Sequence, residues 1–178
     1  MILLLFFFAE VNSVYQLTIN EDWCSKILCL TISIMCLEQG RMAIVDLKKI
    51  KISKKYLKNP QLDNFLIVTS ITIATELLGF YLVSFSQDWS IIIILISLIF
   101  FNSFAKVNIL TSRKILIEYY GVSQRIFVLA ANYFGLGIAT LKIFGFFPEV
   151  MSVILFSMTS IYIVIKYSSN LLSNSINI

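Results

Sequence analysis

Two long apolar stretches, separated by a short polar break, dominate the pattern of hydrophobic and polar positions along the chain. The first covers about residues 65–85 and the second about 89–108, with Ser86, Gln87 and Asp88 between them. At about 1.5 Å per residue, helices of this length cross or nearly cross a hydrocarbon layer of about 30 Å. The pattern therefore predicts two antiparallel membrane-spanning helices joined at the membrane surface.

Two further apolar stretches follow, at about 126–147 and 149–166, and they meet at a turn around Pro148. Asn59 and Pro60 mark the start of the membrane domain, because Asn caps helices, Pro is tolerated in the first turn, and an acid such as Asp63 is favourable there. We expect a membrane domain at 60–167 with four spans and a polar tail at 168–178.

From Val14 onward, segments of the region up to residue 59 alternate between apolar and polar positions, which predicts strands. The apolar run Met1 to Phe8 is too short to span, and no basic residue precedes it as in a signal peptide, so a buried strand is expected. Residues 38–41 read as a turn. The predicted fold class is a membrane all-α bundle of four transmembrane helices with a small N-terminal β-rich, meander-like domain. The alternating apolar positions are Tyr15, Leu17, Ile19, Leu28, Leu30, Ile32, Ile34, Ile50 and Ile52.

An alternative interpretation makes Trp23 to Leu37 a fifth span, with Arg41 on the inner side. Fifteen helical residues cover only about 22 Å, which is shorter than the hydrocarbon layer, and Lys26 would have to extend its amine toward the membrane surface. The strand interpretation is preferred on these grounds, and the fifth span stays open.

Basic residues are concentrated on one side of the predicted spans. The two short turns on the other side carry the acids Asp88 and Glu149. Because positive charge favours the cytoplasmic side, both termini are expected to face the cytoplasm or, in a plastid, the stroma. The basic residues counted are Arg41, Lys48, Lys49, Lys51, Lys54, Lys55, Lys58, Lys106, Arg113, Lys114, Arg125 and Lys166.

Composition supports a membrane protein and limits its chemistry. Hydrophobic residues make up 58% of the 178 residues and charged residues 13%, a shift away from soluble domains. Histidine is absent, which removes the commonest acid–base catalyst and metal ligand. Cys24, Cys29 and Cys36 have neither the spacing of a zinc site nor an even number for disulfides. No cofactor, metal site or catalytic motif is therefore predicted, and the net charge of +4 is assigned to membrane orientation rather than to nucleic-acid binding.

Glu76 and Lys142 are ionisable residues within predicted spans. A charge at the centre of a spanning helix costs about 2.5–3.5 kcal/mol on insertion scales, so Glu76 needs either a partner or a proton. Its functional interpretation is a proton or cation site. The structural interpretation, which is preferred, is an ion pair with Lys142 or a neutral, hydrogen-bonded carboxyl.

Asn102 and Asn132 are expected at similar depth in the second and third spans, where an amide hydrogen bond between them contributes about 0.6–2 kcal/mol. A polar ligand pocket is the alternative to this structural role. Ala131, Gly135 and Ala139 recur every fourth residue and predict a close-packing face on the third span.

Three segments resemble a poorly characterised family of small polytopic membrane proteins from cyanobacteria and red-algal plastids. They are ELLGFYL at 76–82, FFNSFAKV at 100–107 and YGVSQRIFVLAANYFGL at 120–136, about a third of the chain. The resemblance implies a thylakoid or plastid-envelope location and a non-enzymatic role. It supplies no catalytic residues.

The predicted function is that of a non-catalytic accessory or assembly component of a larger membrane complex, for example a photosynthetic one. Its expected partners are the lipid bilayer and other membrane protein subunits, and any small-molecule ligand is unknown. The alternative is a small transporter or channel subunit that uses Glu76, with Asn102 and Asn132 along its path. An enzyme acting on lipid or quinone ranks last, because only Glu76 and Lys142 offer an acid–base pair.

Overall fold

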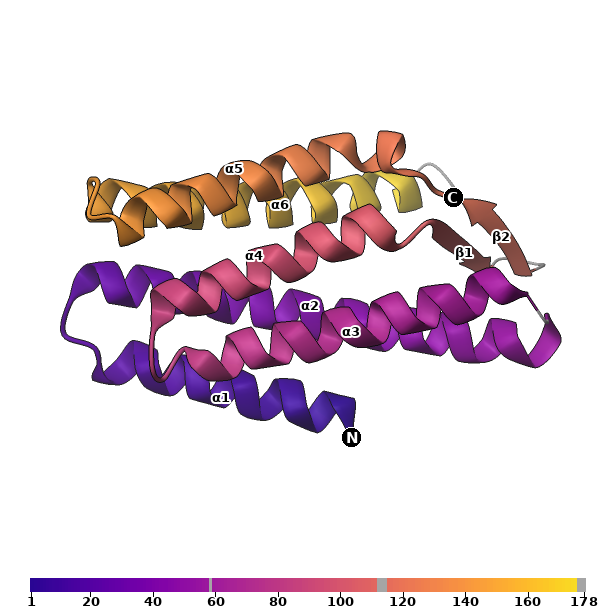
Figure 1. The fold of residues 1–178 in the computed structure, drawn as a ribbon, viewed down its shortest axis with the longest axis horizontal. Coiled ribbons are helices and arrows are strands. Elements are labelled where there is room, and N and C mark those ends of the chain that lie inside the picture. Colours follow the sequence, from indigo (N-terminus) through magenta and orange to yellow (C-terminus); the bar gives the residue numbers. More distant parts are fainter. Residues whose placement is uncertain (58, 112–114, 176–178) are drawn as a thin grey trace.

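A computed structural model describes residues 1–57, 59–111 and 115–175, and the side chains of all but 110, 111, 115 and 169–175 among these. The described chain folds as six α-helices with one two-stranded hairpin between the fourth and fifth (Figure 1). The elements are α1 (Ile2–Ile19), α2 (Trp23–Tyr56), α3 (Pro60–Leu82), α4 (Gln87–Phe104), β1 (Val107–Thr111), β2 (Ile115–Tyr119), the 3-10 turn η1 (Val122–Arg125), α5 (Ile126–Ile143) and α6 (Pro148–Ser175).

All six helices are long and apolar enough to cross a membrane, which fits an integral, polytopic membrane protein. The predicted four-helix bundle with a β-rich domain at 1–59 is therefore wrong, because α1 and α2 occupy that region. The predicted turn at 38–41 lies inside α2, and helix α6 continues through most of the predicted tail. Helix α2 contains the whole of the alternative fifth span and extends it to 34 residues.

The alternation in α2 does not correspond to strand faces. Leu28 and Ile32 are buried, whereas Leu30 is exposed and Ile34 is partly exposed. A spacing of four residues is a helical face. Around a helix in hydrocarbon, the outward side is apolar as well, so apolar residues at every second position carry no information about a sheet.

Helices α1 and α2 form one antiparallel pair and α3 and α4 a second, and their apolar faces meet in the main core (Figure 1). The rings of Phe6 and Phe80 contact edge to face at 6.0 Å. Gly40 lets α1 approach α2 closely, since a Cβ there would lie 3.0 Å from the Phe6 ring. Gly40, which was expected to form part of a turn, therefore allows close packing between α1 and α2.

Side-chain caps begin three of the helices. Asp22 accepts a hydrogen bond from the Ser25 N–H at 2.9 Å, which lowers the pKa of this exposed carboxyl. Asn59 accepts from the Gln61 N–H at 2.9 Å, so the helix start predicted at Asn59 and Pro60 is confirmed. Such caps satisfy backbone donors that the helix itself leaves unpaired.

The hairpin packs against the end of the bundle where α2 connects to α3. Strands β1 and β2 pair antiparallel, with Val107 opposite Tyr119 and Ile109 opposite Ile117. Val107 and Ile109 are buried against Leu62, and together with their neighbours they form a second, smaller core. The hairpin thus covers one end of the helices.

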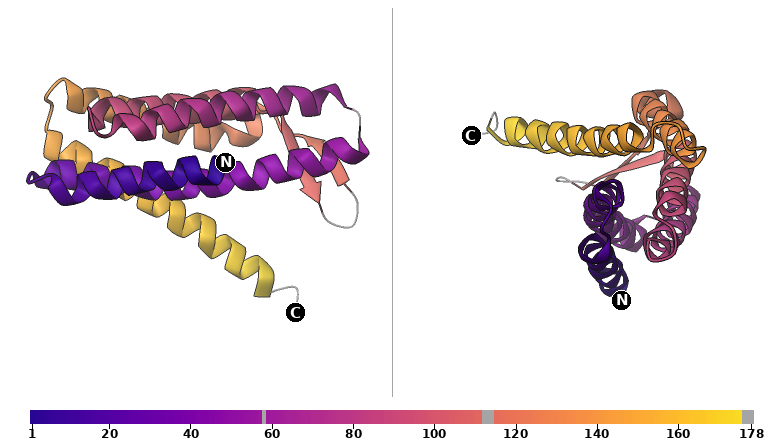
Figure 2. Two further views of the ribbon diagram at one scale, coloured as in Figure 1. Left: turned by 90° about the horizontal axis from the view of Figure 1, so that it is seen from below. Right: turned by 90° about the vertical axis from the view of Figure 1, so that its left-hand side faces the viewer.

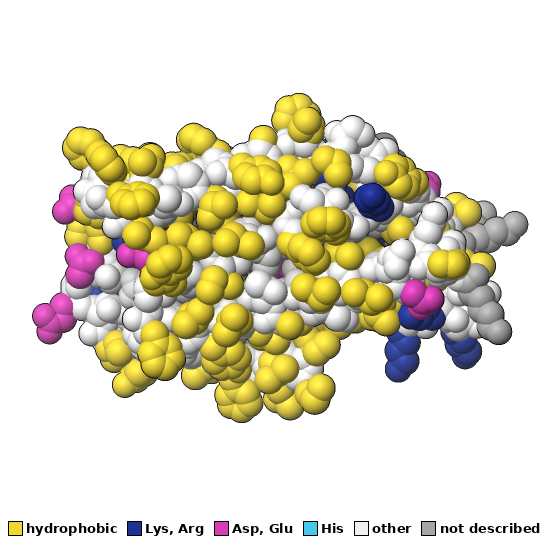
Figure 3. Space-filling model, in the orientation of Figure 1, with side chains coloured by type: hydrophobic (Ala, Val, Ile, Leu, Met, Phe, Trp, Pro, Cys, Tyr) yellow, Lys and Arg dark blue, Asp and Glu magenta, His cyan; other side chains and the backbone are white. Residues whose placement is uncertain are grey.

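Acidic and basic side chains on the surface gather at opposite ends of the molecule. Figure 3 shows a mostly hydrophobic middle, acidic groups at the left-hand end and most of the visible basic groups at the right-hand end. The left-hand end carries the α1–α2, α3–α4 and α5–α6 turns, and the right-hand end carries the hairpin (Figure 1). Lys58, Arg113 and Lys114 of the predicted basic side lie outside the described residues.

Helix α6 leaves the bundle at an angle. It starts beside α5 and then diverges from the other helices, crossing α2 on the way (Figure 2). The remaining five helices run roughly along one axis (Figure 2). This divergence gives the cavity described below its outer wall.

Gly79 lies at a close contact between α3 and α4, and this contact yields a testable prediction. A Cβ at this position would lie 2.8 Å from Ile94 Cγ1 and 3.2 Å from the Ser90 carbonyl oxygen. We expect Gly79→Ala to lower the free energy of unfolding by about 1–3 kcal/mol through overpacking. Thermal unfolding in detergent micelles measures this effect.

Gly137→Ala is the matched control, because a Cβ there meets nothing within 4 Å. Its expected result is unchanged or slightly higher stability, since Ala favours a helix over Gly by about 1 kcal/mol. Equal destabilisation by both substitutions would contradict the close α3–α4 approach.

Candidate functional site

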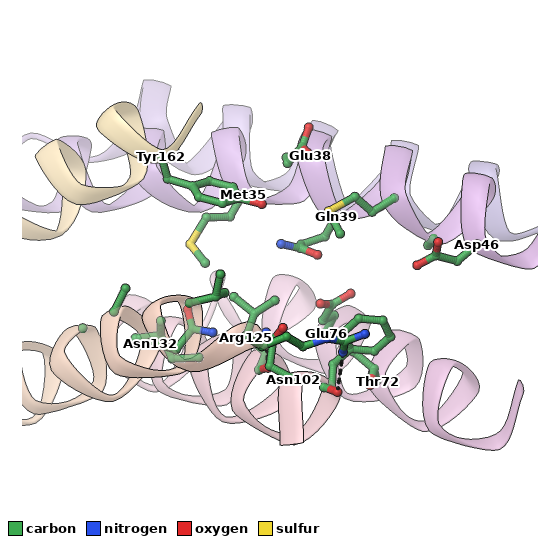
Figure 4. A pocket seen from close by; sticks show the side chains of 18 of the residues that line it. Met35, Glu38, Gln39, Asp46, Thr72, Glu76, Asn102, Arg125, Asn132 and Tyr162 are labelled. Atoms are coloured by element: carbon green, nitrogen blue, oxygen red, sulfur yellow. Dashed lines mark hydrogen bonds between the residues drawn. The ribbon is translucent and has the colours of Figure 1, made fainter. Parts of the chain in front are cut away.

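A cavity of about 740 Å³ lies among α2, α3, α4, α5 and α6, with β1 at one end. Its wall is mostly apolar and carries a few polar groups, the usual composition of a ligand site, and its volume falls within the usual range of about 300–1,000 Å³. Figure 4 shows α2 on one side of the cavity and α3 and α5 on the other. The polar and charged lining residues used below are Glu38, Gln39, Asp46, Lys49, Thr69, Thr72, Glu76, Asn102, Tyr120, Arg125 and Asn132.

Glu76 faces this cavity from α3. Thr69, Thr72 and Glu76 are spaced three and four residues apart, so they form a polar stripe on one face of the helix. Glu76 is only 2% exposed, and its Oε1 has no hydrogen-bond partner among the described residues; the same holds for Thr69 Oγ1. A buried polar atom without a hydrogen-bond partner costs free energy. Two groups of this stripe, those of Glu76 and Thr69, therefore lack the hydrogen bonds that would offset their burial.

Asn102 and Asn132 line the same cavity, from α4 and α5. The hydrogen bond expected between them is not formed. Asn102 Nδ2 donates to the Leu98 carbonyl of its own helix at 2.8 Å, and Asn132 Nδ2 has no partner in the described structure. The structure thus brings Glu76, Asn102 and Asn132 to one cavity without joining them to one another.

Lys142 lies away from this site. Its Nζ pairs with Asp88 Oδ1 at 2.6 Å, so the ion pair suggested between Glu76 and Lys142 is wrong. Lys142 occupies the last turn of α5, next to the first turn of α4. Glu76 lies six residues, about 9 Å, inside the corresponding end of α3. Lys142 therefore pairs with Asp88, the acid at its own end of the helices, and not with Glu76.

The face of α5 that carries Ala131, Gly135 and Ala139 contacts other helices along one part and lines the cavity along another. Gly135 and Ala139 are buried, and a Cβ at Gly135 would contact Leu95 of α4 at 3.5 Å and Met158 of α6 at 3.9 Å. Ala131, one turn earlier, is exposed and lines the cavity, as Gly135 also does. This stripe therefore packs α5 between two helices at one end and opens into the cavity at the other.

Arg125 lines the cavity, although in the sequence it stands out only as a signal of membrane orientation. It is 8% exposed, and its guanidinium lies over the rings of Tyr120 at 4.9 Å and Phe101 at 5.5 Å. Nη1 donates to the Phe101 carbonyl at 3.5 Å (Figure 4). A basic residue before an apolar run usually marks a membrane edge, so its burial in the cavity had no signal in the sequence.

A second charged cluster ties α6 to α2. Glu38, 5% exposed, accepts from Arg41 at 2.8 Å, from Lys166 at 2.5 Å and from the Tyr167 hydroxyl at 2.9 Å. The sequence missed this cluster because its members lie on two helices more than 120 residues apart. These contacts hold the outer wall of the cavity against α2.

Another partly buried carboxylate, that of Glu10 on α1, lies at the contact between α1 and α2. It accepts a hydrogen bond from Ser33, while its Oε2 has no partner among the described residues. The nearby Cys36 thiol donates to the Phe6 carbonyl at 3.6 Å. The sequence offered no signal here, because Glu10 fell in a segment expected to be strand.

Within the described residues, no group of three or more His, Cys, Asp or Glu side chains is arranged to hold a metal ion. Cys24, Cys29 and Cys36 are buried free thiols, all on α2. The chemical capacity of the site is therefore that of a binding cavity with carboxylate, amide and guanidinium groups.

Comparison with known proteins finds no matching family model, no matching curated protein and no matching solved structure. The resemblance of residues 76–141 to small membrane proteins of cyanobacteria and red-algal plastids stays a prediction. The interpretation of the site consequently rests on its geometry.

The pairing of Lys142 is testable by a double-mutant cycle. Asp88→Asn and Lys142→Gln are each expected to lower the free energy of unfolding by about 1–3 kcal/mol, because each leaves a partly buried charge unpaired. The double variant should lose less than the sum of the two.

The matched control cycle combines Lys142→Gln with Glu76→Gln, and it should be additive within about 0.5 kcal/mol. Denaturant unfolding in micelles provides the measurement. Strong coupling in the control cycle, with none between residues 88 and 142, would reverse the assignment.

Proposed function

We propose that this protein is a non-catalytic integral membrane protein that binds a small amphipathic molecule in the cavity among α2–α6. One observation carries the proposal: a buried carboxyl, that of Glu76, faces a large and mainly apolar cavity without a hydrogen-bond partner among the described residues. A bound molecule with a hydroxyl, amide or amine group would supply the missing donor.

The surroundings of Glu76 support a ligand rather than a protein partner. Among the described residues, Thr69 Oγ1 on the same stripe and Asn132 Nδ2 on α5 also lack partners, so unpaired polar groups from two helices line one cavity. Buried polar groups in proteins are nearly always hydrogen-bonded, and a shared ligand satisfies several at once. The surrounding apolar wall suits the rest of an amphipathic molecule.

A second candidate is the accessory or assembly role in a larger membrane complex. It is supported by the divergence of α6 from the bundle, which leaves one side of this helix without helical neighbours (Figure 2). In this role the bound molecule would be held for the complex, and Glu76 would not move protons or ions. The plastid or thylakoid location rests on the sequence resemblance alone.

The role of Glu76 is tested with Glu76→Gln, which keeps the size of the side chain and removes the charge. We expect the variant to fold and to retain at least tenfold less of the copurifying small molecule, because an amide lacks the carboxylate's acceptor strength. Native mass spectrometry of the detergent-solubilised protein measures the retained molecule.

Glu149→Gln, at the exposed α5–α6 turn, is the matched control and should retain the wild-type amount. Proton-linked flux in vesicles, lost only in Glu76→Gln, would favour the transporter alternative. Wild-type protein that copurifies with no small molecule, together with equal behaviour of both variants, would refute ligand binding.

The proposed orientation places both termini on the cytoplasmic or stromal side. It is supported by the separation of charge between the two ends of the bundle (Figure 3) and by the even number of spanning helices. Acidic turns would then face the opposite compartment.

Reporter fusions test this orientation. Fluorescent reporters at both termini should be active on the cytoplasmic side of a bacterial inner membrane, and a phosphatase inserted at Glu149 should be active on the other side. Activity of the two terminal reporters on opposite sides would exclude a six-span topology.

A further inference from the structure

Arg125 is a buried cation that forms no salt bridge within the described part of the chain. Among the described residues, no carboxylate oxygen lies within 4.0 Å of its guanidinium. The guanidinium has five N–H donors, and one hydrogen bond, the long contact to the Phe101 carbonyl, engages them. A buried, unpaired charge is expensive, so an arginine in this position calls for an anion.

Asp46 is the carboxylate that faces Arg125, from α2 on the opposite wall of the cavity (Figure 4). The two attract each other electrostatically but form no salt bridge. Asp46 is also attracted by Lys49 on its own helix. The donors of Arg125 therefore remain available on the side facing the cavity.

The polarity of the cavity changes along its length. Arg125 begins α5 beside the hairpin, whereas Gly135 lies ten residues, about 15 Å, further along the helix. At the level of Gly135 the wall includes Leu95 and Met158. Arg125 thus lies near one membrane surface, whereas the deeper wall is mainly apolar and carries the Glu76 carboxyl as a polar group. A charged head beside Arg125 with an apolar body below it matches the polarity of a lipid in a bilayer.

The cavity also reaches the apolar outside of the bundle. Three of its lining residues are largely exposed: Phe127 by 88%, Ile161 by 58% and Ile165 by 64%. Because these residues are on α5 and α6, the opening faces the hydrocarbon rather than water. A molecule dissolved in the membrane can enter by this route.

We infer that the ligand is an amphipathic anion, with a carboxylate or phosphate head bound to Arg125 and an apolar body extending toward Leu95 and Met158. This inference rests on the ligand-binding function proposed above and adds the class of the ligand. The planar guanidinium binds such heads with two parallel hydrogen bonds, and the rings of Tyr120 and Phe101 hold it in place. Glu76, deeper in the cavity, accepts from a donor on the body of the ligand.

The test compares two probes with one chain and different heads, oleate and oleyl alcohol, on the purified full-length protein in detergent. Wild-type protein should bind oleate at least tenfold more tightly than oleyl alcohol in a competition assay read by native mass spectrometry. Arg125→Gln should abolish this preference, because it weakens the binding of oleate much more than that of oleyl alcohol. Arg125→Lys should restore part of the preference, since it keeps the charge but loses the two-pronged geometry.

Lys106→Gln is the matched control, because it removes one exposed positive charge near the same end of the bundle without lining the cavity. Its preference for oleate should equal that of the wild type. A preference lost equally in Lys106→Gln would overturn the assignment to Arg125, since general attraction by surface charge would then explain it.

The wild-type comparison needs no variant, so it decides the question even if Arg125→Gln does not fold. Binding of both probes without preference would overturn the anionic head but leave the ligand-binding function standing. Absence of binding by both probes would refute the two together. In nanodiscs, retention of phosphatidylglycerol over phosphatidylcholine would identify a membrane phospholipid as the source, and retention of oleate alone would identify a free fatty acid; both results support the inference.

Discussion

The structure depends on one constraint: in hydrocarbon, every backbone donor and acceptor must find its partner within the protein. Helices meet this requirement locally, which is why the described chain is almost entirely helical and why the hairpin lies at one end of the bundle. Because both the core and the lipid-facing side of such helices are apolar, burial alone does not decide which face turns inward. Close contacts decide it instead, as where Gly40 meets Phe6 and Gly79 meets Ile94.

The same constraint makes each interior charge informative. Glu38 is satisfied by Arg41, Lys166 and Tyr167, and Asp88 is satisfied by Lys142, so these groups stabilise the packing of helices. Glu76 and Arg125 have no such partners among the described residues, and both face the same cavity. Desolvation makes such groups costly, so a protein that keeps them benefits from a ligand that completes them. The contrast between paired and unpaired charges is the physical basis for the proposed binding role.

Helix α6 contributes to both groups of charges, because it carries Lys166 of the Glu38 cluster and lines the cavity that Glu76 and Arg125 face. Its N-terminal part packs on α5, and Lys166 near its C-terminal end contacts α2 through the Glu38 cluster, with cavity lining between these two attachments. The cavity therefore exists because α6 diverges from the bundle and is attached at two points along its length. Ligand entry from the membrane and the stability of the α2–α6 contact are consequently properties of the same helix.

The sequence by itself determined that long apolar segments alternate with short polar turns, that basic residues gather between particular segments, and that Asn59 begins a helix. Those features are local, because they follow from hydropathy and capping over a few residues. It also singled out Glu76, Asn102 and Asn132, since a polar residue in an apolar span is conspicuous. The first 59 residues were assigned to strands because helices with two apolar sides show no helical period, and Leu28 to Ile34 alternate by chance. Only the tertiary structure decided that Lys142 pairs with Asp88, that Arg125 is buried, and that Glu38 holds α6, because each depends on which side chains of distant helices lie at the same depth.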